Sequence, residues 1–269
     1  MPELPEVETI RRQLERMLVG QKIKRVRKLR EKSWRGNKKE VERRRIVGVG
    51  RRAKVLVIEL EGKSFLLIHL KLTGQLIWMK QSEKPGKHTR VVLELDKGRL
   101  FFNDMRVFGW IKVMDEEQME EELSKFGPDV NSKKFTVGYL KEILGSSSRA
   151  VKLILLDQKK LGGVGNIYAN EGLYCAGIDP RRSGKEVAKD EGGVRRLFKC
   201  LKRVIEQGIR YGGATASDES FVDALGGQGR YQQRFLAYER KGKCRRCGGG
   251  IKKIKLGGRG TYFCPGCQK

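Results

Sequence analysis

Apolar residues near the start of the chain recur at the spacing of one helical face. They are Val7, Ile10, Leu14 and Leu18. Pro5 suits the first turn of a helix, and Gly20 suits its end. The pattern predicts a helix that ends near residue 18 and holds residues 1–6 rigidly at one edge of a domain.

From Ile23 to about Val113 the pattern changes to short β-branched and aromatic runs. The clearest runs are VLVIEL at 55–60, SFLLIHL at 64–70, VVLELD at 91–96, RLFF at 99–102 and WIKVM at 110–114. Turn signals such as Glu61-Gly62, Thr73-Gly74 and Lys97-Gly98 separate them. Repeated short strands with few helices predict an antiparallel β-sandwich.

The second half of the chain has a helical pattern. Residues 115–148 are charged and interrupted by glycine and proline, so we place a domain boundary there. Glycines at 162–165 precede a predicted short helix from Asn166 to about Cys175. A longer helix spans about 194–209 and ends at Gly212-Gly213. Residues 213–234 are rich in Gly, Ser and Asp and predict a mobile loop.

Charge narrows the choice of partner. The 59 Lys and Arg against 32 Asp and Glu give a formal net charge of +27, which favours a polyanion such as nucleic acid. A surface tuned only for solubility is the alternative, but added acids serve solubility better than added bases. We find no amphipathic helix for membrane binding, no transmembrane run and no signal peptide, so we expect a cytosolic protein.

Four of the six cysteines form two close pairs, Cys244-x2-Cys247 and Cys264-x2-Cys267, sixteen residues apart. Two thiolate pairs at this spacing predict one structural zinc, with no open position for a catalytic water. Cys175 and Cys200 lie in apolar, helix-like segments and are interpreted as small buried side chains without chemistry. The two histidines, His69 and His88, lie near predicted strands and are interpreted as structural.

Three segments, MPELPEVETIRR at the start, GGVGNIYANEGLY in the middle and GRGTYFCPGCQK at the end, resemble the bacterial formamidopyrimidine-DNA glycosylase family. The resemblance spans nearly the whole chain. It implies an α+β protein with an N-terminal antiparallel β-sandwich flanked by helices, then a helical helix-two-turn-helix domain and a C-terminal zinc finger. We expect a catalytic domain over 1–130, a helical domain with a lesion-capping loop over 131–234, and a zinc finger over 235–269.

The resemblance also implies a nucleophile. In this family Met1 is removed, and Pro2 becomes a free secondary amine. An α-amino group titrates near pH 7.7–8.0, so part of it is neutral at physiological pH. Glu3 is then expected to act as general acid and base at the sugar, Glu6 to orient the N-terminal segment, and Lys54 to contact the lesion and a phosphate. Without the resemblance, Glu3 and Glu6 are ordinary first-turn charges and Lys54 is a solvated strand-edge lysine.

The DNA-binding residues follow in the same way. Leu72 is expected to fill the gap left by the extruded base, Arg106 to hydrogen-bond the orphaned cytosine, and Phe108 to wedge between base steps. The family commonly has Met at the position of Leu72, and both are apolar. Taken alone, Leu72 and Phe108 are typical of strand cores. Phosphate contacts are expected from Asn166 at a helix start and from Arg259. His88 is also expected to contact DNA.

The predicted function is excision of 8-oxoguanine and formamidopyrimidines from duplex DNA, followed by strand cleavage. The predicted partner is damaged double-stranded DNA, bound by a monomer in the cytoplasm at the nucleoid. The loop over 214–229, which corresponds to the part that folds over the extruded purine, departs from the commonest family pattern. Two alternatives stay open: an endonuclease VIII-like glycosylase for oxidised pyrimidines, and a noncatalytic zinc-finger protein. The second explains the charge but not the Pro2, Glu3 and Glu6 start.

Overall fold

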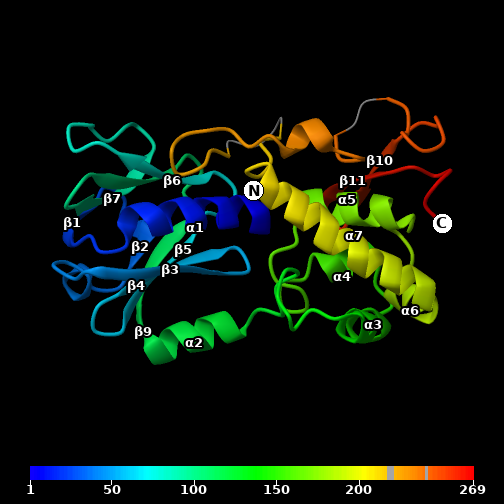
Figure 1. Cartoon of the computed structure of the whole chain (residues 1–269), viewed down its shortest axis with the longest axis horizontal. Coiled ribbons are helices and arrows are strands. Elements are labelled where there is room, and N and C mark those ends of the chain that lie inside the picture. Colours follow the sequence, from blue (N-terminus) through cyan, green and yellow to red (C-terminus); the bar gives the residue numbers. More distant parts are fainter. Residues whose placement is uncertain (217–220, 240–241) are drawn as a thin grey trace. The chain divides into compact units, whose positions relative to one another are not determined.

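A computed structural model describes residues 1–216, 221–239 and 242–269 (Figure 1). The chain forms two compact units, and each is made of two chain segments. The first unit contains Met1–Lys125 and Tyr211–Gln232, and the second contains Phe126–Arg210 and Gln233–Lys269. The sequence placed the segment around 211–232 with the helical domain, whereas its contacts group it with the first unit.

The first unit is built on two sheets (Figure 1). Its strands are β1 (Ile23–Lys28), β2 (Trp34–Arg35), β3 (Ile46–Arg52), β4 (Val55–Leu60), β5 (Ser64–His69), β6 (Gly74–Met79), β7 (Thr89–Leu95), β8 (Arg99–Asp104) and β9 (Trp110–Asp115). One sheet has the order β1-β7-β8-β6 and the other β2-β9-β5-β4-β3. All pairs are antiparallel except the short parallel pair of β2 with β9. The predicted antiparallel sandwich is therefore confirmed with one parallel exception.

The helix α1 (Leu4–Leu18) supplies one side of the core of this unit. Its four periodic apolar residues are fully buried and join strand residues of both sheets in one hydrophobic cluster. The expected helix is present, and Gly20 follows it with a φ of +87° that a side chain rarely adopts. The first residues of the chain are therefore attached to the best-packed helix of the unit.

The charged segment after the sandwich contains two helices that the sequence pattern did not reveal. They are α2 (Glu116–Ser124) and α3 (Val137–Gly145). Asp115 caps α2 by accepting the backbone N–H of Gln118 at 2.9 Å, and Thr136 caps α3 through Tyr139 at 3.1 Å. No residue of α2 is buried, so it has no hydrophobic stripe to detect.

The second unit is helical and ends in a hairpin. Besides α3, its helices are α4 (Val151–Leu155), α5 (Asn166–Ala176), α6 (Gly184–Lys189) and α7 (Glu191–Arg210). Its strands are β10 (Lys252–Leu256) and β11 (Arg259–Phe263). The predicted helices at 166–175 and 194–209 correspond to α5 and α7. Gly257 and Gly258 both have positive φ, at +56° and +77°, as a two-residue hairpin turn requires.

The segment expected to be a mobile loop makes specific contacts within the first unit. The Gln13 side chain donates to Asp223 Oδ2 at 2.9 Å and accepts the N–H of Ala224 at 2.9 Å. The N–H of Trp78 in β6 donates to the carbonyl of Ala224 at 2.8 Å. Residues 217–220 of the predicted lesion-capping loop lie outside the described residues. Asp223 and Ala224 of the segment are thereby anchored to α1 and to the sandwich.

Cys175 and Cys200 correct the sequence interpretation. They are only half-buried, and they form a disulfide that links α5 to α7 within the second unit. Their Cα atoms are 5.7 Å apart, which is an ordinary separation for such a bond. The apolar spacing within each helix does not show which residues of α5 face which residues of α7. The sequence therefore did not predict that these two cysteines lie close together. Among the described residues, none of the helices is long and apolar enough to cross a bilayer.

Candidate active site

The start of the chain is buried. Pro2, Glu3 and Glu6 are all inaccessible to solvent or nearly so. Glu6 accepts two backbone N–H groups, from Glu3 at 2.8 Å and from Ala214 at 2.7 Å. A buried carboxylate with strong donors on both oxygens is held in one position. Glu6 therefore fixes the residue next to Pro2 and joins it to the segment at 211–216.

A second buried carboxylate anchors the outer side of α1. Burial raises the pKa of Glu8, but hydrogen bonds from Arg12, Arg11 and Arg51 outweigh this effect and hold the pKa below its usual value. Arg51 lies in β3, and its Nε is 3.1 Å from Glu8 Oε2. This ion pair fixes the first turns of α1 against the sheet, so the N-terminal residues have a rigid base.

Lys54 is a buried lysine, with 5 % of its surface exposed, in the turn between β3 and β4. It is therefore not the solvated strand-edge lysine of the alternative interpretation. Burial, with Lys71 and Lys54 nearby, lowers the pKa of His69 to about 3, so the imidazole is neutral at physiological pH. His69 Nδ1 accepts the N–H of Lys71 at 2.9 Å, which leaves the remaining proton on Nε2.

Two loops carry the residues expected to enter the DNA. Leu72 lies in the turn between β5 and β6, and Arg106 and Phe108 lie in the wedge loop, residues 105–109, between β8 and β9. Phe108 is 53 % exposed, and the Arg106 guanidinium lies 5.0 Å from its ring centroid. Leu72 and Phe108 are thus in loops, not in strand cores. An exposed phenylalanine beside an arginine suits insertion between bases.

Asp104 joins these two loops, and the sequence gave no sign of its role. It is fully buried at the end of β8. Its carboxylate accepts the Thr73 hydroxyl from one loop, and the N–H groups of Arg106 at 3.2 Å and Gly109 at 2.7 Å from the other. A Cβ at Gly109 would lie 2.7 Å from the Phe102 ring, so only glycine fits there. Asp104 therefore fixes the relative position of Leu72 and the wedge loop.

His88 lies just before β7 and is exposed, which does not support the structural interpretation. Its carbonyl accepts the N–H of Asp104 at 2.9 Å, so its backbone is attached to the residue that joins the two loops. This position suits the expected contact with DNA. The imidazole of His69, by contrast, is part of the fold.

In the second unit, Asn166 is the first residue of α5, as expected. The preceding residue, Gly165, is extended, so the first N–H groups of the helix follow a sharp change of direction. Such N–H groups bind phosphate well. Arg259 is the first residue of β11, directly after the glycine turn of the hairpin, and it is exposed.

The four predicted zinc ligands meet. The Sγ atoms of Cys244, Cys247, Cys264 and Cys267 all lie within 4.8 Å of one another. Cys244 and Cys267 are separated by 3.7 Å, and Cys247 and Cys264 by 3.5 Å. A tetrahedron with Zn–S bonds of about 2.3 Å requires S–S separations of about 3.8 Å, so the donor set fits zinc. Burial and the contact with Cys244 raise the pKa of Tyr174 to about 12, so its hydroxyl stays protonated and can donate to the Cys244 sulfur, 3.0 Å away.

Comparison with known proteins decides the family. Residues 1–111 match the formamidopyrimidine-DNA glycosylase N-terminal domain, 126–220 its H2TH domain, and 241–269 the zinc finger found in FPG and IleRS. The chain belongs to the formamidopyrimidine-DNA glycosylase family. A relative from Pelotomaculum thermopropionicum named formamidopyrimidine-DNA glycosylase is 39 % identical over 100 % of this chain and 99 % of its own.

Two solved structures of the family extend the comparison. The crystal structure of MutM (FPG) from Thermus thermophilus is 37 % identical, with a TM-score of 0.91 over 99 % of this chain and 98 % of that one. A Lactococcus lactis FPG mutant in complex with a Fapy-dG containing DNA is 33 % identical, with a TM-score of 0.93 over 100 % of both chains. The predicted α+β fold, helix-two-turn-helix domain and zinc finger are confirmed.

Two further buried charged residues hold the zinc finger and the chain before it in place. Glu171 in α5 accepts the N–H groups of Leu236, Ala237 and Tyr238 at 2.7–2.9 Å, which fixes the chain before the finger. Lys152 in α4 is fully buried, and its Nζ donates to the Gly260 carbonyl at 2.9 Å and to Thr261 Oγ1 at 2.7 Å. The only sequence signal for either is a charged residue within an apolar helical face.

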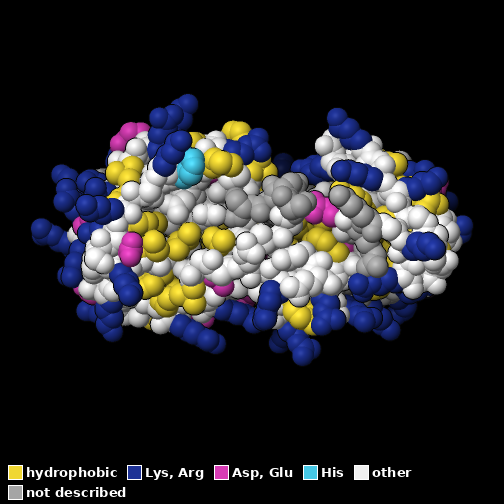
Figure 2. Space-filling view, turned by 90° about the horizontal axis from the view of Figure 1, so that it is seen from above, with side chains coloured by type: hydrophobic (Ala, Val, Ile, Leu, Met, Phe, Trp, Pro, Cys, Tyr) yellow, Lys and Arg dark blue, Asp and Glu magenta, His cyan; other side chains and the backbone are white. Residues whose placement is uncertain are grey.

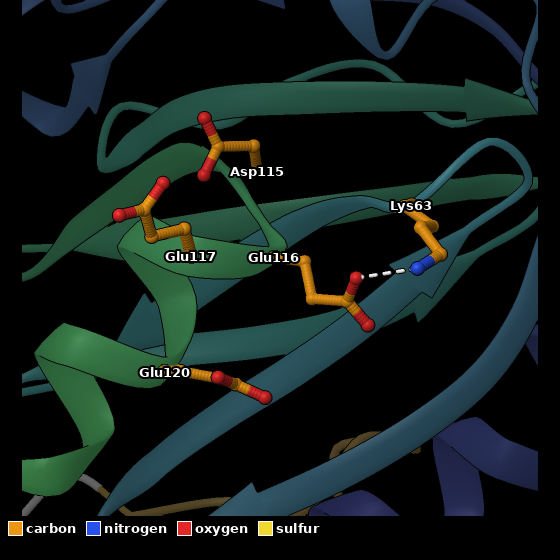
Figure 3. A pocket seen from close by; sticks show the side chains of 5 residues that line it. All are labelled: Lys63, Asp115, Glu116, Glu117 and Glu120. Carbon is orange, nitrogen blue, oxygen red and sulfur yellow. Dashed lines mark hydrogen bonds and ion pairs between the residues drawn. The ribbon is translucent and has the colours of Figure 1, made fainter.

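Surface charge separates regions that can face DNA from one that cannot. Lys and Arg side chains line much of the rim of the face in Figure 2. A cavity of about 470 Å³ where α2 begins is instead lined by Asp115, Glu116, Glu117, Glu120 and Lys63, and the Lys63 Nζ is 2.6 Å from Glu116 Oε2 (Figure 3). Four carboxylates with one paired lysine repel a phosphodiester. This acidic cavity is therefore unsuited to contact with the DNA backbone.

Proposed function

We propose that this protein excises oxidised purines, including 8-oxoguanine and formamidopyrimidines, from duplex DNA with the Pro2 amine as nucleophile. Family membership makes it an enzyme, a base-excision DNA glycosylase with AP lyase activity, and its partner is damaged DNA. The observation that carries the choice of nucleophile is the buried Pro2–Glu3–Glu6 start, in which Glu6 holds the N–H of Glu3 at 2.8 Å. A fixed nucleophile beside a fixed carboxylate suits covalent catalysis.

The chemistry follows from a neutral secondary amine. As the Pro2 nitrogen forms a bond to C1′ of the damaged nucleotide, the bond from C1′ to the base breaks, the base takes up a proton and the nitrogen gives up its own. Opening of the sugar ring, with a proton delivered to O4′, leaves an iminium between Pro2 and C1′. The iminium acidifies the C2′ proton, and two eliminations then release the phosphates on both sides. Glu3 moves the protons at the sugar.

Insertion into the DNA stabilises the extruded nucleotide. Leu72 fills the vacant position, Arg106 binds the orphaned cytosine and Phe108 wedges between base steps, at an unstacking cost of a few kcal/mol. Asp104 keeps the two loops in register. In the second unit, Asn166 at the start of α5 and Arg259 on the zinc hairpin bind phosphates, which position the duplex.

The nitrogen of Pro2 becomes nucleophilic only after Met1 is removed, because a peptide bond to Met1 converts it to an amide. We expect mass spectrometry of active protein to show a chain that begins at Pro2. We also place the enzyme in the bacterial cytoplasm at the nucleoid, since its substrate is chromosomal DNA.

Borohydride trapping tests the proposal. Incubation with a duplex that contains 8-oxoguanine opposite cytosine, followed by borohydride, reduces the iminium to a stable protein–DNA crosslink. A peptide map is expected to locate the crosslink at Pro2. Absence of a crosslink from folded, DNA-binding protein contradicts the mechanism. Faster excision of thymine glycol than of 8-oxoguanine would move the enzyme to the oxidised-pyrimidine branch.

A further inference from the structure

A second cavity of the first unit lies directly beside the wedge loop. It measures about 460 Å³, and its main lining residues are Lys32, Trp34, Arg35, Val107, Phe108 and Trp110. We propose that this aromatic cavity binds one nucleotide of the undamaged strand, next to the cytosine opposite the lesion. The inference rests on the proposed function and adds a strand contact to it.

The floor of the aromatic cavity is rigid. The parallel pair of β2 with β9 places Trp34 beside Ile111 and Arg35 beside Lys112. Trp34 is 5 % exposed, and its Nε1 donates to the carbonyl of Gly36 at 3.0 Å. Gly36 has a φ of +97°, and a Cβ there would lie 2.8 Å from Val113 Cβ. Residues 34 and 110 are far apart in the sequence and come together only through the pairing of β2 with β9. The sequence pattern therefore did not predict the cavity.

The rings of the cavity suit a nucleobase. Phe108 is 53 % exposed and borders the cavity, and Trp110 is partly accessible, with the Lys112 Nζ 4.5 Å from its ring centroid. Aromatic side chains stack on any base, because each base has a π face. Cavities of a few hundred Å³ accommodate a ligand of nucleotide size.

The charges of the cavity suit a phosphate. Lys32 and Arg35 are exposed, and among the residues that the structure describes neither has an ion-pair partner. The single lining carboxylate, Glu31, is paired with Lys28, whose Nζ is 2.7 Å from Glu31 Oε2. Two available cations beside aromatic rings match the two ends of a nucleotide. The acidic cavity of Figure 3, of similar volume, has the opposite charge.

The wedge loop determines which strand reaches the cavity. If Phe108 separates two bases of the undamaged strand, the nucleotide on its far side passes along the ring and meets the cavity that the ring borders. Val107, a β-branched residue, has a φ of +57°, which is an unfavourable backbone conformation. Such conformations concentrate at functional sites, where the surrounding structure holds them.

An abasic walk along the undamaged strand tests the inference. The probe is a duplex with a stable tetrahydrofuran site at the lesion position and cytosine opposite, and one further abasic residue is moved over three positions on each side of the cytosine. For the wild-type protein we expect one position at which loss of the base weakens binding by about 5- to 30-fold, measured by fluorescence anisotropy. In Trp110→Leu this loss is expected to shrink to within about twofold, since the stacking partner is gone.

A second experiment removes the charge of one phosphate and of one exposed side chain. Because the side chain is exposed, the variant is expected to fold as the wild type does. An uncharged methylphosphonate at the same nucleotide is expected to weaken the wild-type protein by about 3- to 10-fold and to leave Arg35→Ala nearly unaffected. Lys97→Ala is the matched control, because Lys97 is exposed at the opposite end of β8 from the wedge loop.

The outcomes separate the two proposals. Equal position dependence in wild type, Trp110→Leu and Arg35→Ala overturns the aromatic cavity as a nucleotide site, and so does a control variant that behaves like Arg35→Ala. Borohydride trapping of the wild-type protein on an 8-oxoguanine duplex is measured in parallel. A crosslink without the position-specific coupling leaves the proposed function standing and removes only this inference.

Discussion

The two units of the chain use polar groups in opposite ways. In the first unit the decisive groups are buried and hydrogen-bonded: Glu6 between two backbone N–H groups, and Asp104 between two loops. In the second, the predicted DNA contacts are exposed or half-exposed groups on a frame held by buried polar residues and the four cysteines. We therefore expect the reaction to depend on how the buried groups are positioned, and DNA binding to depend on the charge of the exposed groups. Variants of these buried groups of the first unit should change the reaction more than affinity, and variants of the exposed groups of the second should do the reverse.

The largest effect is expected at Pro2. A Pro2→Gly variant keeps an amine but loses the ring that holds the nitrogen in place and makes it a secondary amine. We expect excision to slow by on the order of 100-fold or more, with DNA affinity within about threefold of wild type. Single-turnover kinetics and anisotropy on the same duplex measure both quantities. Equal losses in rate and affinity would break the contrast between the units.

Zinc removal should produce the largest loss of affinity. Cys247→Ala removes one of four ligands, and the hairpin that carries Arg259 then loses its frame. We expect DNA binding to weaken by on the order of 100-fold and the protein to retain less than one equivalent of zinc. Metal analysis and anisotropy are the measurements, with Lys252→Ala, an exposed hairpin residue outside the cluster, as the control. Wild-type affinity in a zinc-free variant would contradict the structural role.

A smaller effect is expected where two loops share one carboxylate. Asp104→Ala leaves the N–H groups of Arg106 and Gly109 without their acceptor, which costs about 1–3 kcal/mol per buried donor. Excision is expected to fall by about 10- to 100-fold through poor insertion, and Asp104→Asn to recover part of it through its remaining acceptor oxygen. Fluorescence of 2-aminopurine at the lesion position reports insertion directly. Full activity in Asp104→Ala would show that the loops hold their register without it.

Arg259→Ala should weaken DNA binding by about 5- to 10-fold and reduce the slope of log Kd against log salt concentration by about one. The rate at saturating DNA is expected to stay within about twofold of wild type, since the contact proposed for Arg259 is with phosphate and not with the sugar. Lys252→Ala is the control on the same hairpin. A changed slope with the control alone would place the phosphate contact elsewhere.

The smallest effect at neutral pH concerns His69. Its pKa is depressed to about 3 in the folded state, so the unfolded chain binds a proton first as the pH falls below about 6.5. The stability that His69 contributes is complete above pH 6.5 and is lost as the pH falls toward 3, at up to about 1.4 kcal/mol per unit. His69→Asn should flatten this dependence in urea unfolding at pH 7.5, 6.0 and 4.5. A pH dependence in His69→Asn as steep as in wild type would contradict this role of His69.

The sequence predicted those elements whose cause is local. The helices α1 and α7 follow from apolar spacing and glycine stops, and the zinc ligands follow from two Cys-x2-Cys pairs. The exposed helix α2 has no apolar stripe, so its pattern resembled a linker. The ends of the strands β1, β3 and β6 could not be set from their mixed basic, glycine and polar composition.

The site was predictable as residue types but not as an arrangement. Family resemblance named Pro2, Glu3 and Glu6, yet no pattern near them indicates that Glu6 binds the N–H of Ala214, 208 positions later. Asp104 was missed because its partners are mainly backbone groups, which every residue has. The roles of the predicted site residues stay predictions, and the variants above test them.

The first unit takes in both Met1–Lys125 and Tyr211–Gln232, and this has a consequence for biosynthesis. A ribosome delivers Glu6 and Gln13 early, whereas their partners Ala214 and Asp223 are translated only after the Phe126–Arg210 segment of the second unit. The sandwich can pack while the nascent chain grows, but Glu6 gains its bond to the N–H of Ala214 only 208 residues later. The hydrogen bonds that hold the Glu6 and Gln13 side chains are therefore absent until synthesis has passed residue 224.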